Sequence, residues 1–451
     1  MSASRRTFLK SLGLGAGAYV LSSAMTPRRA FAAPLPDRNF VFCYFSGGWD
    51  TLLSLDPRDP NVFTDARVGE TGIELGWDRL DTATYSPTLI QPAGSRIALG
   101  PAAGGIAPHF DQMCVVRGVS MDTVTHDVGR RYFITGMPPR GTRAAGSSIG
   151  TRVAAQQGDL RPLPHLVSRV ESYNEGDPPF SSGLSVSGAA DLLTALQDGP
   201  QAPRTAMRTR LDEYRAAHTD CDPAALDKGG FIGLVRQTQT KARSLVQSGV
   251  ARHFQFGSTT DQEMIDLRMR YGITNANTIN GASQAALAFQ ALKHGVAQTV
   301  TVELTGGLDT HDVNWQDDQP DRQAAGWNAL GRLVADLKAE PHPSGDRLID
   351  HTTIVAFSEF GRTARINNRD GRDHSLNSSC MLLGAGVPHN TVIGASSDSG
   401  MNPRKVNPMT GRPDDAGGVT MSPSLVMASI MQAAGLDTQK LRVHGLPCLM
   451  A

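Results

Sequence analysis

Carboxylate and imidazole side chains stand at the ends of short apolar runs in this sequence. They follow three such runs and directly precede a fourth, and the residues concerned are Asp50, Asp309, His311, Glu359, Asp373 and His374. Carboxylate oxygens and neutral imidazole nitrogens are the ligands that hold Zn, Mn, Mg or Ca in proteins. A pair of glycines shortly before Asp50, and another before Asp309, lets the backbone turn tightly there. The pattern predicts a site for a divalent metal and leaves the identity of the metal open.

Each of these residues also has a simpler explanation. An acidic side chain at the end of a strand commonly caps a helix or forms a salt bridge in a loop. Two arginines of the same region, Arg362 and Arg372, either neutralise an anion with their planar guanidinium groups or pair with Asp370 or Asp373 and fix the loop. Because four separate segments carry such residues, and both histidines stand beside acids, the combination favours the metal site.

The elements that must position these residues are visible as two kinds of pattern. Apolar runs rich in β-branched residues are typical of strands buried on both faces of a parallel sheet, and they occur at 39–45, 112–118, 297–304, 351–357 and 379–384. Helical patterns occur at 281–294, 321–339 and 422–434, the last with Ser422 as N-cap and Pro423 in the first turn. The alternation predicts an α/β fold with a doubly wound, mostly parallel sheet flanked by helices. Ligands bind beyond the carboxyl ends of the strands in such sheets, so the candidate residues should meet at one edge.

The stretch from about 155 to 280 differs from the rest of the chain. Proline- and glycine-rich loops at 161–187 precede polar helical patterns, and no clear strand is visible. We predict a helical insertion within a single domain that spans residues 33–451.

The first 32 residues have the features of an export signal. The sequence SRRTFLK places paired arginines before a modestly apolar stretch, and AFA at 30–32 offers small residues to a peptidase. The stretch is too short and too weakly apolar for a stable membrane anchor. We therefore expect the twin-arginine translocation machinery as a partner and a periplasmic or secreted location. That route carries folded proteins, often with a cofactor already bound.

Charge and cysteine usage exclude some functions. The whole chain has 43 basic and 43 acidic residues, and without the first 32 residues 38 basic and 43 acidic ones remain, so neither nucleic acid nor an anionic membrane is an expected partner. The five cysteines are widely spaced, and most are predicted to be buried, although an oxidising compartment would permit one or two bridges. His109, His165 and His294 are predicted to pack or cap, and His351 precedes a strand, at the wrong end for the metal site.

Several blocks resemble a known family. FCYFSGGWDTLLSL, TGGLDTHDVNWQ and FSEFGRTARINNRDGRDHSLNSSCMLLGAGV, together with the twin-arginine start, resemble the DUF1501 family of exported bacterial proteins of unknown function. The likeness covers nearly the whole chain. That family is in turn distantly similar to the alkaline phosphatase and sulfatase superfamily, which implies an alkaline-phosphatase-like fold.

The resemblance to the superfamily implies roles for particular residues. Asp50 matches its aspartate after the first strand, Asp309 and His311 its downstream Asp and His, and His374 its last histidine. Glu359 stands in a block where relatives have Asp-His, and Phe360 replaces that histidine. The nucleophile position falls on His126, with Arg130, Thr135 and Gly136 matching the helix that follows and Thr123 and Thr125 as alternative hydroxyls. A histidine at this position makes the usual formylglycine chemistry of sulfatases improbable.

Two functions remain open at the level of sequence. One is an exported metal-dependent hydrolase of phosphate-type or sulfate-type esters, in which His126, Arg130 and Arg362 are catalytic and an anionic ester is the substrate. The other is a non-catalytic binding or assembly protein that has kept the fold and the metal site. Phe360 and His126 favour the second, whereas the acids, imidazoles and arginines favour the first.

Overall fold

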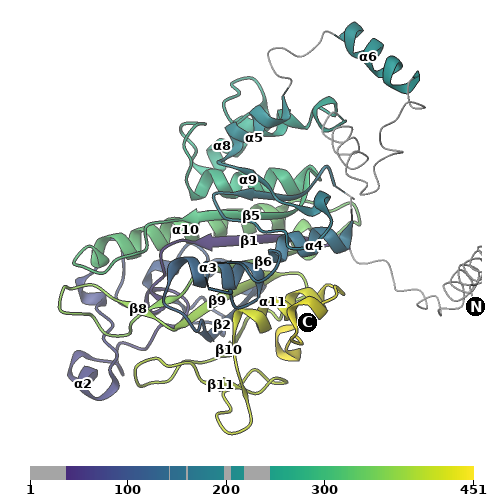
Figure 1. Cartoon of the computed structure of the whole chain (residues 1–451). Helices are drawn as coiled ribbons and strands as arrows, with labels where there is room; N and C mark the ends of the chain where they lie inside the picture. The colour runs from purple at the N-terminus through teal and green to yellow at the C-terminus, as the bar shows by residue number, and fades with distance from the viewer. Residues whose placement is uncertain (1–36, 142, 159–160, 198–204, 218–243) are drawn as a thin grey trace, which may run out of the picture. The chain divides into compact units, whose positions relative to one another are not determined.

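The fold is built on an eight-stranded sheet, shown in Figure 1. The computed structural model describes residues 37–141, 143–158, 161–197, 205–217 and 244–451. The strands of the sheet lie in the order β10-β2-β9-β6-β1-β5-β3-β4. They are β1 (Asn39–Phe45), β2 (Met113–Ser120), β3 (Leu163–Ser168), β4 (Leu184–Val186), β5 (Ala297–Thr305), β6 (Thr352–Phe357), β9 (Asn377–Gly384) and β10 (Thr391–Gly394). All pairs are parallel except those that β9 forms with β2 and β6, so the predicted class of a mostly parallel α/β sheet is confirmed.

Helices cover both faces of the sheet. In β1, Val41, Cys43 and Phe45 pack into one hydrophobic core and the alternate residues pack into another, as the two-residue period of a strand requires. The first core includes side chains of α9 (Gly281–Lys293) and α10 (Trp315–Ala339). The second includes side chains of α3 (His126–Thr135), α4 (Ile149–Gln157) and α11 (Pro423–Ala433). Burial on both faces explains why the strands read as continuous apolar runs.

The other elements are smaller. They are the helices α2 (Val68–Thr71), α5 (Ala189–Leu196), α6 (Thr205–Ala217) and α8 (Gln262–Tyr271), and the paired strands β7 (Gly361–Arg362) with β8 (His374–Ser375) and β11 (Lys405–Val406) with β12 (Val419–Thr420). Short 3₁₀ turns join many of these elements.

The predicted elements lie close to the observed ones. All five predicted strands are present with ends within two residues, and Ser422 caps α11 by accepting a hydrogen bond from the Leu425 amide. The helix predicted at 321–339 begins earlier, at Trp315, and contains Pro320. Burial of Trp315 and Gln319 holds this additional turn although Pro320 has no N–H to donate.

The predicted helical insertion is wrong in one respect. The region 155–280 contains β3 and β4, which belong to the central sheet. β4 is only three residues long, and Pro164 and His165 interrupt the apolar run of β3, so neither strand shows a clear pattern in the sequence. The helices α5, α6 and α8 also lie in this region.

Two expectations fall partly or wholly outside the described residues. The predicted signal segment, 1–32, is one, and Cys221 is the other. The described cysteines, Cys43, Cys114, Cys380 and Cys448, are buried and unbridged. Within the described part of the chain, no helix has the length and apolar character needed to cross a membrane.

Candidate metal centre

Four connections bring the candidate residues to one edge of the sheet: those after β1 and β5, the one between β6 and β9, and the one that leads into α3. β1, β5 and β6 are parallel, so the loops that follow them leave the sheet on the same side. β9 runs the opposite way, and the residues before it, including His374, therefore reach that same edge. α3 contributes His126 as its first residue. The sheet topology thus explains how segments far apart in sequence meet.

Close packing between two of these loops depends on a glycine. Gly47 has a φ of +115°, in the region that side chains rarely adopt. A β-carbon at this position would lie 2.6 Å from the backbone nitrogen of Leu308. The loop after β1 can therefore lie directly against the loop that carries Asp309 only because residue 47 has no side chain.

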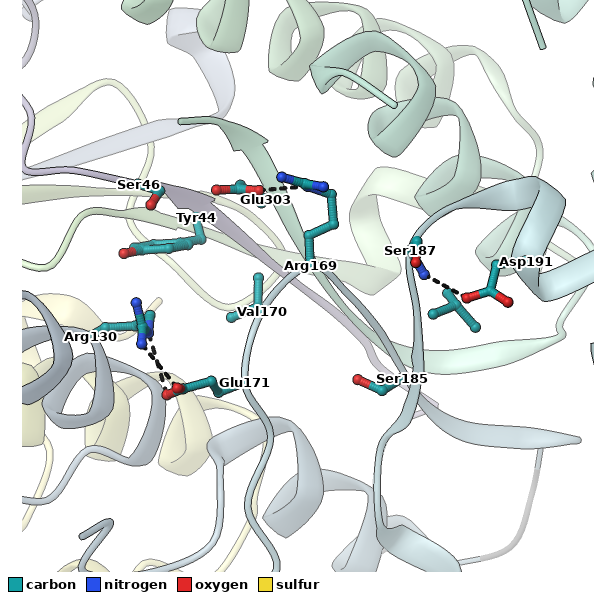
Figure 2. A pocket seen from close by; sticks show the side chains of 11 residues that line it. Tyr44, Ser46, Arg130, Arg169, Val170, Glu171, Ser185, Ser187, Asp191 and Glu303 are labelled. Atoms are coloured by element: carbon teal, nitrogen blue, oxygen red, sulfur yellow. Dashed lines mark hydrogen bonds and ion pairs between the residues drawn. The ribbon is translucent and has the colours of Figure 1, made fainter. Parts of the chain in front are cut away.

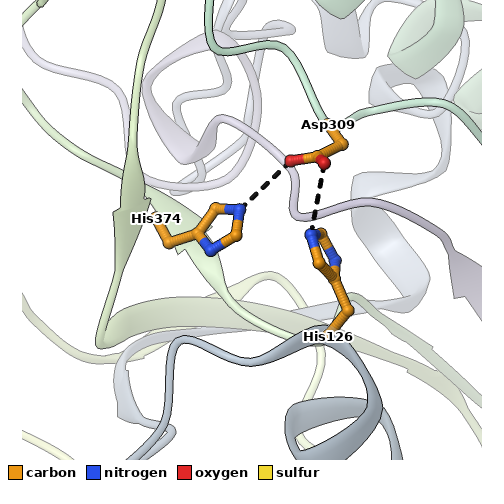
Figure 3. A group of neighbouring side chains, drawn as sticks. All are labelled: His126, Asp309 and His374. Carbon is orange, nitrogen blue, oxygen red and sulfur yellow. Dashed lines mark hydrogen bonds and ion pairs between the residues drawn. The ribbon is translucent and has the colours of Figure 1, made fainter.

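Asp309 is the centre of the cluster. Its Oδ1 lies 2.9 Å from Nε2 of His311 and 3.1 Å from Nε2 of His374, and its Oδ2 lies 3.4 Å from Nε2 of His126. In Figure 3, His126 and His374 both point toward the Asp309 carboxylate. One ligand atom each from His126, Asp309 and His374 lie within 4.8 Å of one another. The Nε2 atoms of His311 and His374 are 3.0 Å apart.

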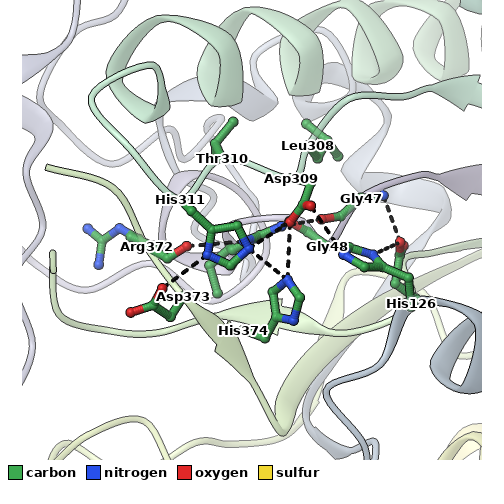
Figure 4. Close-up of polar contacts among 12 residues, drawn as sticks. Gly47, Gly48, His126, Leu308, Asp309, Thr310, His311, Arg372, Asp373 and His374 are labelled. Carbon is green, nitrogen blue, oxygen red and sulfur yellow. Dashed lines mark hydrogen bonds and ion pairs between the residues drawn. The ribbon is translucent and has the colours of Figure 1, made fainter. Parts of the chain in front are cut away.

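The other ring nitrogen of each histidine faces a hydrogen-bond acceptor. Nδ1 of His126 lies 2.9 Å from Oε1 of Glu359, and Nδ1 of His311 lies 3.0 Å from Oδ1 of Asp373. Nδ1 of His374 lies 2.7 Å from the carbonyl oxygen of Val124. Because a carboxylate or carbonyl can only accept, each Nδ1 must carry the proton, and in the neutral ring Nε2 then carries the lone pair. Figure 4 shows the contact between His311 and Asp373 and the contacts around Asp309.

This arrangement fits a divalent cation. Three Nε2 lone pairs and a carboxylate converge on one place, and lone pairs that face one another repel unless a cation lies between them. Histidines that bind metals almost always donate the other N–H to a carboxylate or carbonyl, as all three do here. With neutral imidazoles, the three carboxylates of the cluster and the Arg362 guanidinium leave a formal charge of −2. A divalent ion would neutralise it.

The pKa shifts of the cluster favour ionised carboxylates and a neutral His374, whereas His126 is protonated more readily than an ordinary histidine. Burial lowers the pKa of His374 below its ordinary value, which favours the neutral ring. Burial would raise the pKa of Asp309, but the hydrogen bond from the Arg362 guanidinium holds it well below its usual range. Burial also opposes ionisation of Glu359, yet its hydrogen bond with His126 keeps its pKa below the ordinary value. The same bond raises the pKa of His126. Asp309 and Glu359 are therefore ionised at neutral pH.

Arg362 holds the cluster in place. Its side chain is fully buried, and its Nη2 lies 2.6 Å from Oδ1 of Asp309. The other donors are directed at the carbonyls of Gly47, Gly48 and Arg372 and at Nε2 of His311. All five N–H groups of the guanidinium are thus committed. This corrects its predicted role, because no free edge remains to neutralise a substrate anion.

Asp50 does not join the cluster. It is only 1% exposed, its Oδ1 caps a 3₁₀ turn by accepting from the Leu52 amide, and its Oδ2 lies 2.9 Å from Nε1 of Trp315 and 2.8 Å from Nε of Arg372. These contacts occupy the carboxylate, so its prediction as a metal ligand is wrong. Arg372 is fully buried and stacks over Trp315 at 4.7 Å, and it pairs with Asp50 rather than with Asp370 or Asp373.

Glu359 and Asp373 lie beside the centre in a supporting role. Each was predicted as a ligand, and each instead accepts the Nδ1 proton of a histidine that faces Asp309. Glu359 also accepts a hydrogen bond of 2.8 Å from the Gly47 amide, which leaves that carboxylate turned away from Asp309. The predicted residues that converge are therefore Asp309, His311 and His374, together with His126.

Arg130 lies in a neighbouring cleft. The cleft has a volume of about 730 Å³ and is lined by Tyr44, Ser46, Arg130, Arg169, Val170, Glu171, Ser185, Val186, Ser187, Asp191 and Glu303. The Arg130 guanidinium lies 2.9 Å from Glu171 and 2.8 Å from Asp127, as Figure 2 shows for the first pair. Its placement beside the metal ligands is thus not observed. Two of its lining residues are close in sequence to the centre, since Ser46 precedes Gly47 and α3 carries both His126 and Arg130.

Sequence reasoning missed two parts of the site. The Val124 carbonyl, which fixes the ring of His374, has no signature in the sequence because every residue has a carbonyl group. The cleft is lined by residues of β1, α3, β4, α5 and β5 and of the loop after β3, and neither β3 nor β4 had a readable pattern. His126 was found only through the family resemblance, since a single histidine before a helix is not distinctive.

Fold and cluster together define a class: a mostly parallel α/β protein with a histidine-rich centre at the carboxyl ends of its strands. The chain belongs to the DUF1501 family of proteins of unknown function, whose model matches residues 37–441. No curated protein sequence is a significant match to the chain.

Solved structures of the superfamily that the motifs resemble are among the matches. A protein in the alkaline phosphatase superfamily from Vibrio parahaemolyticus is 8% identical with a TM-score of 0.37, over 94% of this chain and 75% of that one. The protein Ps i-CgsB is 9% identical with a TM-score of 0.38, over 91% and 75%. A variant of TAB5 alkaline phosphatase with Mg bound is 7% identical with a TM-score of 0.33, over 90% and 99%. The function must therefore be argued from the site of this chain.

Proposed function

We propose that this protein is an exported metal-dependent hydrolase of phosphate-type or sulfate-type esters. The observation that carries the proposal is the convergence of three Nε2 atoms on Asp309, each from a ring whose Nδ1 is held by an acceptor. Such a set holds the metal ligands in position before the cation binds, and no imidazole proton lies between them.

The side chains divide into two groups by their distance from Asp309. His311 and His374 both contact Oδ1, at 2.9 and 3.1 Å, and with Asp309 they would form a three-residue ligand set if the metal displaces the Arg362 N–H that lies 3.3 Å from Nε2 of His311. A bound divalent ion would polarise an ester oxygen and lower the pKa of a water molecule. Zn, Mn and Mg are all compatible with two imidazoles and a carboxylate.

His126 is placed to move a proton. Its Nε2 lies on the other side of the carboxylate, 3.4 Å from Oδ2, and its side chain is 34% exposed. Glu359, buried behind it, accepts the Nδ1 proton and would stabilise the imidazolium, so Nε2 can accept a proton from an attacking hydroxyl group. This pairing is the arrangement of a base and its orienting carboxylate. The adjacent cleft offers space for the remainder of an ester.

Metal content and turnover test the proposal together. We expect protein purified without chelator to contain a divalent ion that depends on the cluster, and Asp309→Ala and His374→Ala to lose it. Asp50→Asn is the matched control, because it removes a buried carboxylate of the same edge that faces Arg372 instead; it should keep the metal while losing stability. Equal metal content in all four proteins would contradict the site.

Turnover of a panel of phosphate mono- and diesters and sulfate esters separates hydrolysis from binding. Loss of turnover in His126→Gln with the metal retained would support the enzyme. A metal-loaded protein that hydrolyses none of these esters would instead support the non-catalytic reading, which the full commitment of Arg362 to protein acceptors favours.

Export is part of the proposal and is supported by SRRTFLK near the start of the chain. Fractionation of cells that express the full chain should find the protein outside the cytoplasm, and replacement of Arg5 and Arg6 by lysine should retain it inside. The same distribution for both would contradict the twin-arginine route.

A further inference from the structure

A second group of possible metal ligands lies at the opposite edge of the sheet. It consists of His342, Asp346 and His351, all in the connection between α10, which ends at Ala339, and β6, which begins at Thr352. This connection enters β6 at its amino end, whereas the Asp309 cluster lies at the carboxyl ends of the strands. The two groups therefore share no residue and no loop.

The backbone of the connection is held in a tight hairpin. The His342 amide donates to the Asp346 carbonyl at 2.7 Å, the Gly345 amide donates to the His342 carbonyl at 2.9 Å, and Pro341 forms a bridge with Arg347. His351 follows in a 3₁₀ turn, Leu348–His351. Main-chain bonds therefore fix the backbone that carries the three side chains.

The polar atoms of the three side chains converge. Nε2 of His351 lies 2.8 Å from both oxygens of Asp346, and Nδ1 of His342 lies 3.7 Å from Oδ1 of Asp346. The hydroxyl of Ser344 lies between them, 2.5 Å from Asp346, 2.5 Å from His342 and 3.1 Å from His351. Two imidazole nitrogens and a carboxylate are ligand types that zinc takes in proteins, and a tetrahedral site would leave one further position.

Charge also favours a cation here. The two imidazole rings stack with centroids 3.6 Å apart and planes 12° apart. Arg347 is directed away from the group, with its guanidinium on Asp350 at 2.7 and 2.9 Å. Among the described residues, the ion-pair partners of Asp346 are these two imidazoles alone.

A comparable group elsewhere in the chain already contains a positively charged side chain. His253 and His294 also stack, at 3.4 Å, beside a carboxylate, Glu263. There the ammonium of Lys293 lies 2.9 Å from Oε1 of Glu263 and supplies the positive charge. A metal ion would have to compete with that lysine, so this group serves as an internal control.

We propose that His342, Asp346 and His351 form a second metal site, of the zinc type, which closes the connection between α10 and the central strand β6. The bound ion would cross-link the hairpin to the start of the strand and stabilise it. The site is independent of the proposed hydrolase function, because none of its residues contacts the Asp309 cluster in the described structure.

The test uses an Asp309→Ala background, in which the first site is removed. Cobalt(II) is added as a spectroscopic substitute for zinc, and the visible absorption of the metal is recorded. We expect the bands of a tetrahedral site at about one equivalent of cobalt, displacement by one equivalent of zinc, and loss of the bands when His351→Ala is added. His342→Gln should act in the same way, and each variant's circular dichroism shows whether it is folded.

His294→Ala is the matched control, and it should leave the absorption and the stoichiometry unchanged. Zinc should also raise the melting temperature of the Asp309→Ala protein but not that of the version with His351→Ala. Binding only at a large excess of metal, or equal binding after loss of His351 and His342, would overturn the proposal. A failure of the Asp309 cluster to bind metal would not overturn this proposal, because that cluster is disrupted in the background protein.

Discussion

The proton on each Nδ1 decides what the histidines of the main cluster can do. His126, His311 and His374 would be ordinary surface histidines if their rings could rotate freely, since they are between a fifth and a third exposed. An acceptor behind each ring fixes its orientation and its tautomer, and the lone pair then faces Asp309. The supporting residues therefore matter as much as the ligands.

Asp373 provides a direct check of this idea. We expect Asp373→Ala to weaken metal binding by about 10- to 100-fold, because His311 loses the acceptor that holds its ring. Titration against a chromophoric chelator measures the affinity. Asp312→Ala is the control, since this equally exposed neighbour pairs with Arg369 and not with an imidazole. An equal loss in both variants would mean that only overall charge matters.

At the scale of elements, the site depends on how closely α3 approaches the loop after β6. Gly129 lies one turn after His126 on α3, and a β-carbon there would be 2.3 Å from the carbonyl oxygen of Glu359. A backbone atom cannot move aside as a side chain can. The absence of a side chain at residue 129 is what allows His126 and Glu359 to come within hydrogen-bonding distance.

Substitution of Gly129 should uncouple this pair. In Gly129→Ala, α3 must shift, and we expect a loss of about 1–3 kcal/mol in the free energy of unfolding. The pKa of His126, which its bond with Glu359 raises, should fall toward the ordinary value because the bond lengthens. Denaturant unfolding and an NMR titration measure the two effects. Gly69→Ala, in the helix α2 where a β-carbon has open space, should leave the His126 pKa unchanged and should not lower the free energy of unfolding; an unchanged His126 pKa in Gly129→Ala would contradict this account.

At the scale of the whole molecule, the burial of both faces of the sheet makes the stability of the fold depend on pH. His165 on β3 is 1% exposed, and it contacts Thr301 at 3.0 Å and Thr151 at 3.3 Å. Burial lowers the pKa of His165 to about 3. In the unfolded chain, His165 would have a pKa of about 6.5. Below that pH the unfolded state binds a proton that the folded state does not.

The free energy of unfolding should therefore fall with acidification. From about pH 6.5 down to about pH 3, His165 should account for a slope of about 1.4 kcal/mol per pH unit. The contribution of the neutral, buried His165 to the free energy of unfolding is complete above about pH 6.5 and is lost as the pH falls toward about 3. Urea unfolding at several pH values measures the slope, which should be shallower in His165→Gln. His444→Gln, at an exposed histidine, should leave the slope unchanged, and identical slopes in all three proteins would refute the assignment.

The local pattern of the chain was enough to predict most of the sheet. Strands such as β1 and β6 are continuous apolar runs because both of their faces are buried, and α11 carries its own cap in Ser422 and Pro423. β3 and β4 could not be predicted in this way. The strand conformation of β3 depends on pairing with β5, which lies more than a hundred residues away in sequence, and β4 in turn pairs with β3.

The sequence by itself determined that acids and histidines would gather at one edge, because strand direction fixes where each connecting loop emerges. Only the tertiary structure decided which of them converge. Asp50 and Asp309 both follow a strand and a glycine pair. The Asp50 carboxylate nevertheless pairs with Arg372 and Trp315, whereas the Asp309 carboxylate faces three imidazoles. The difference depends on partners brought from distant segments, and the type and spacing of residues near an aspartate do not record them.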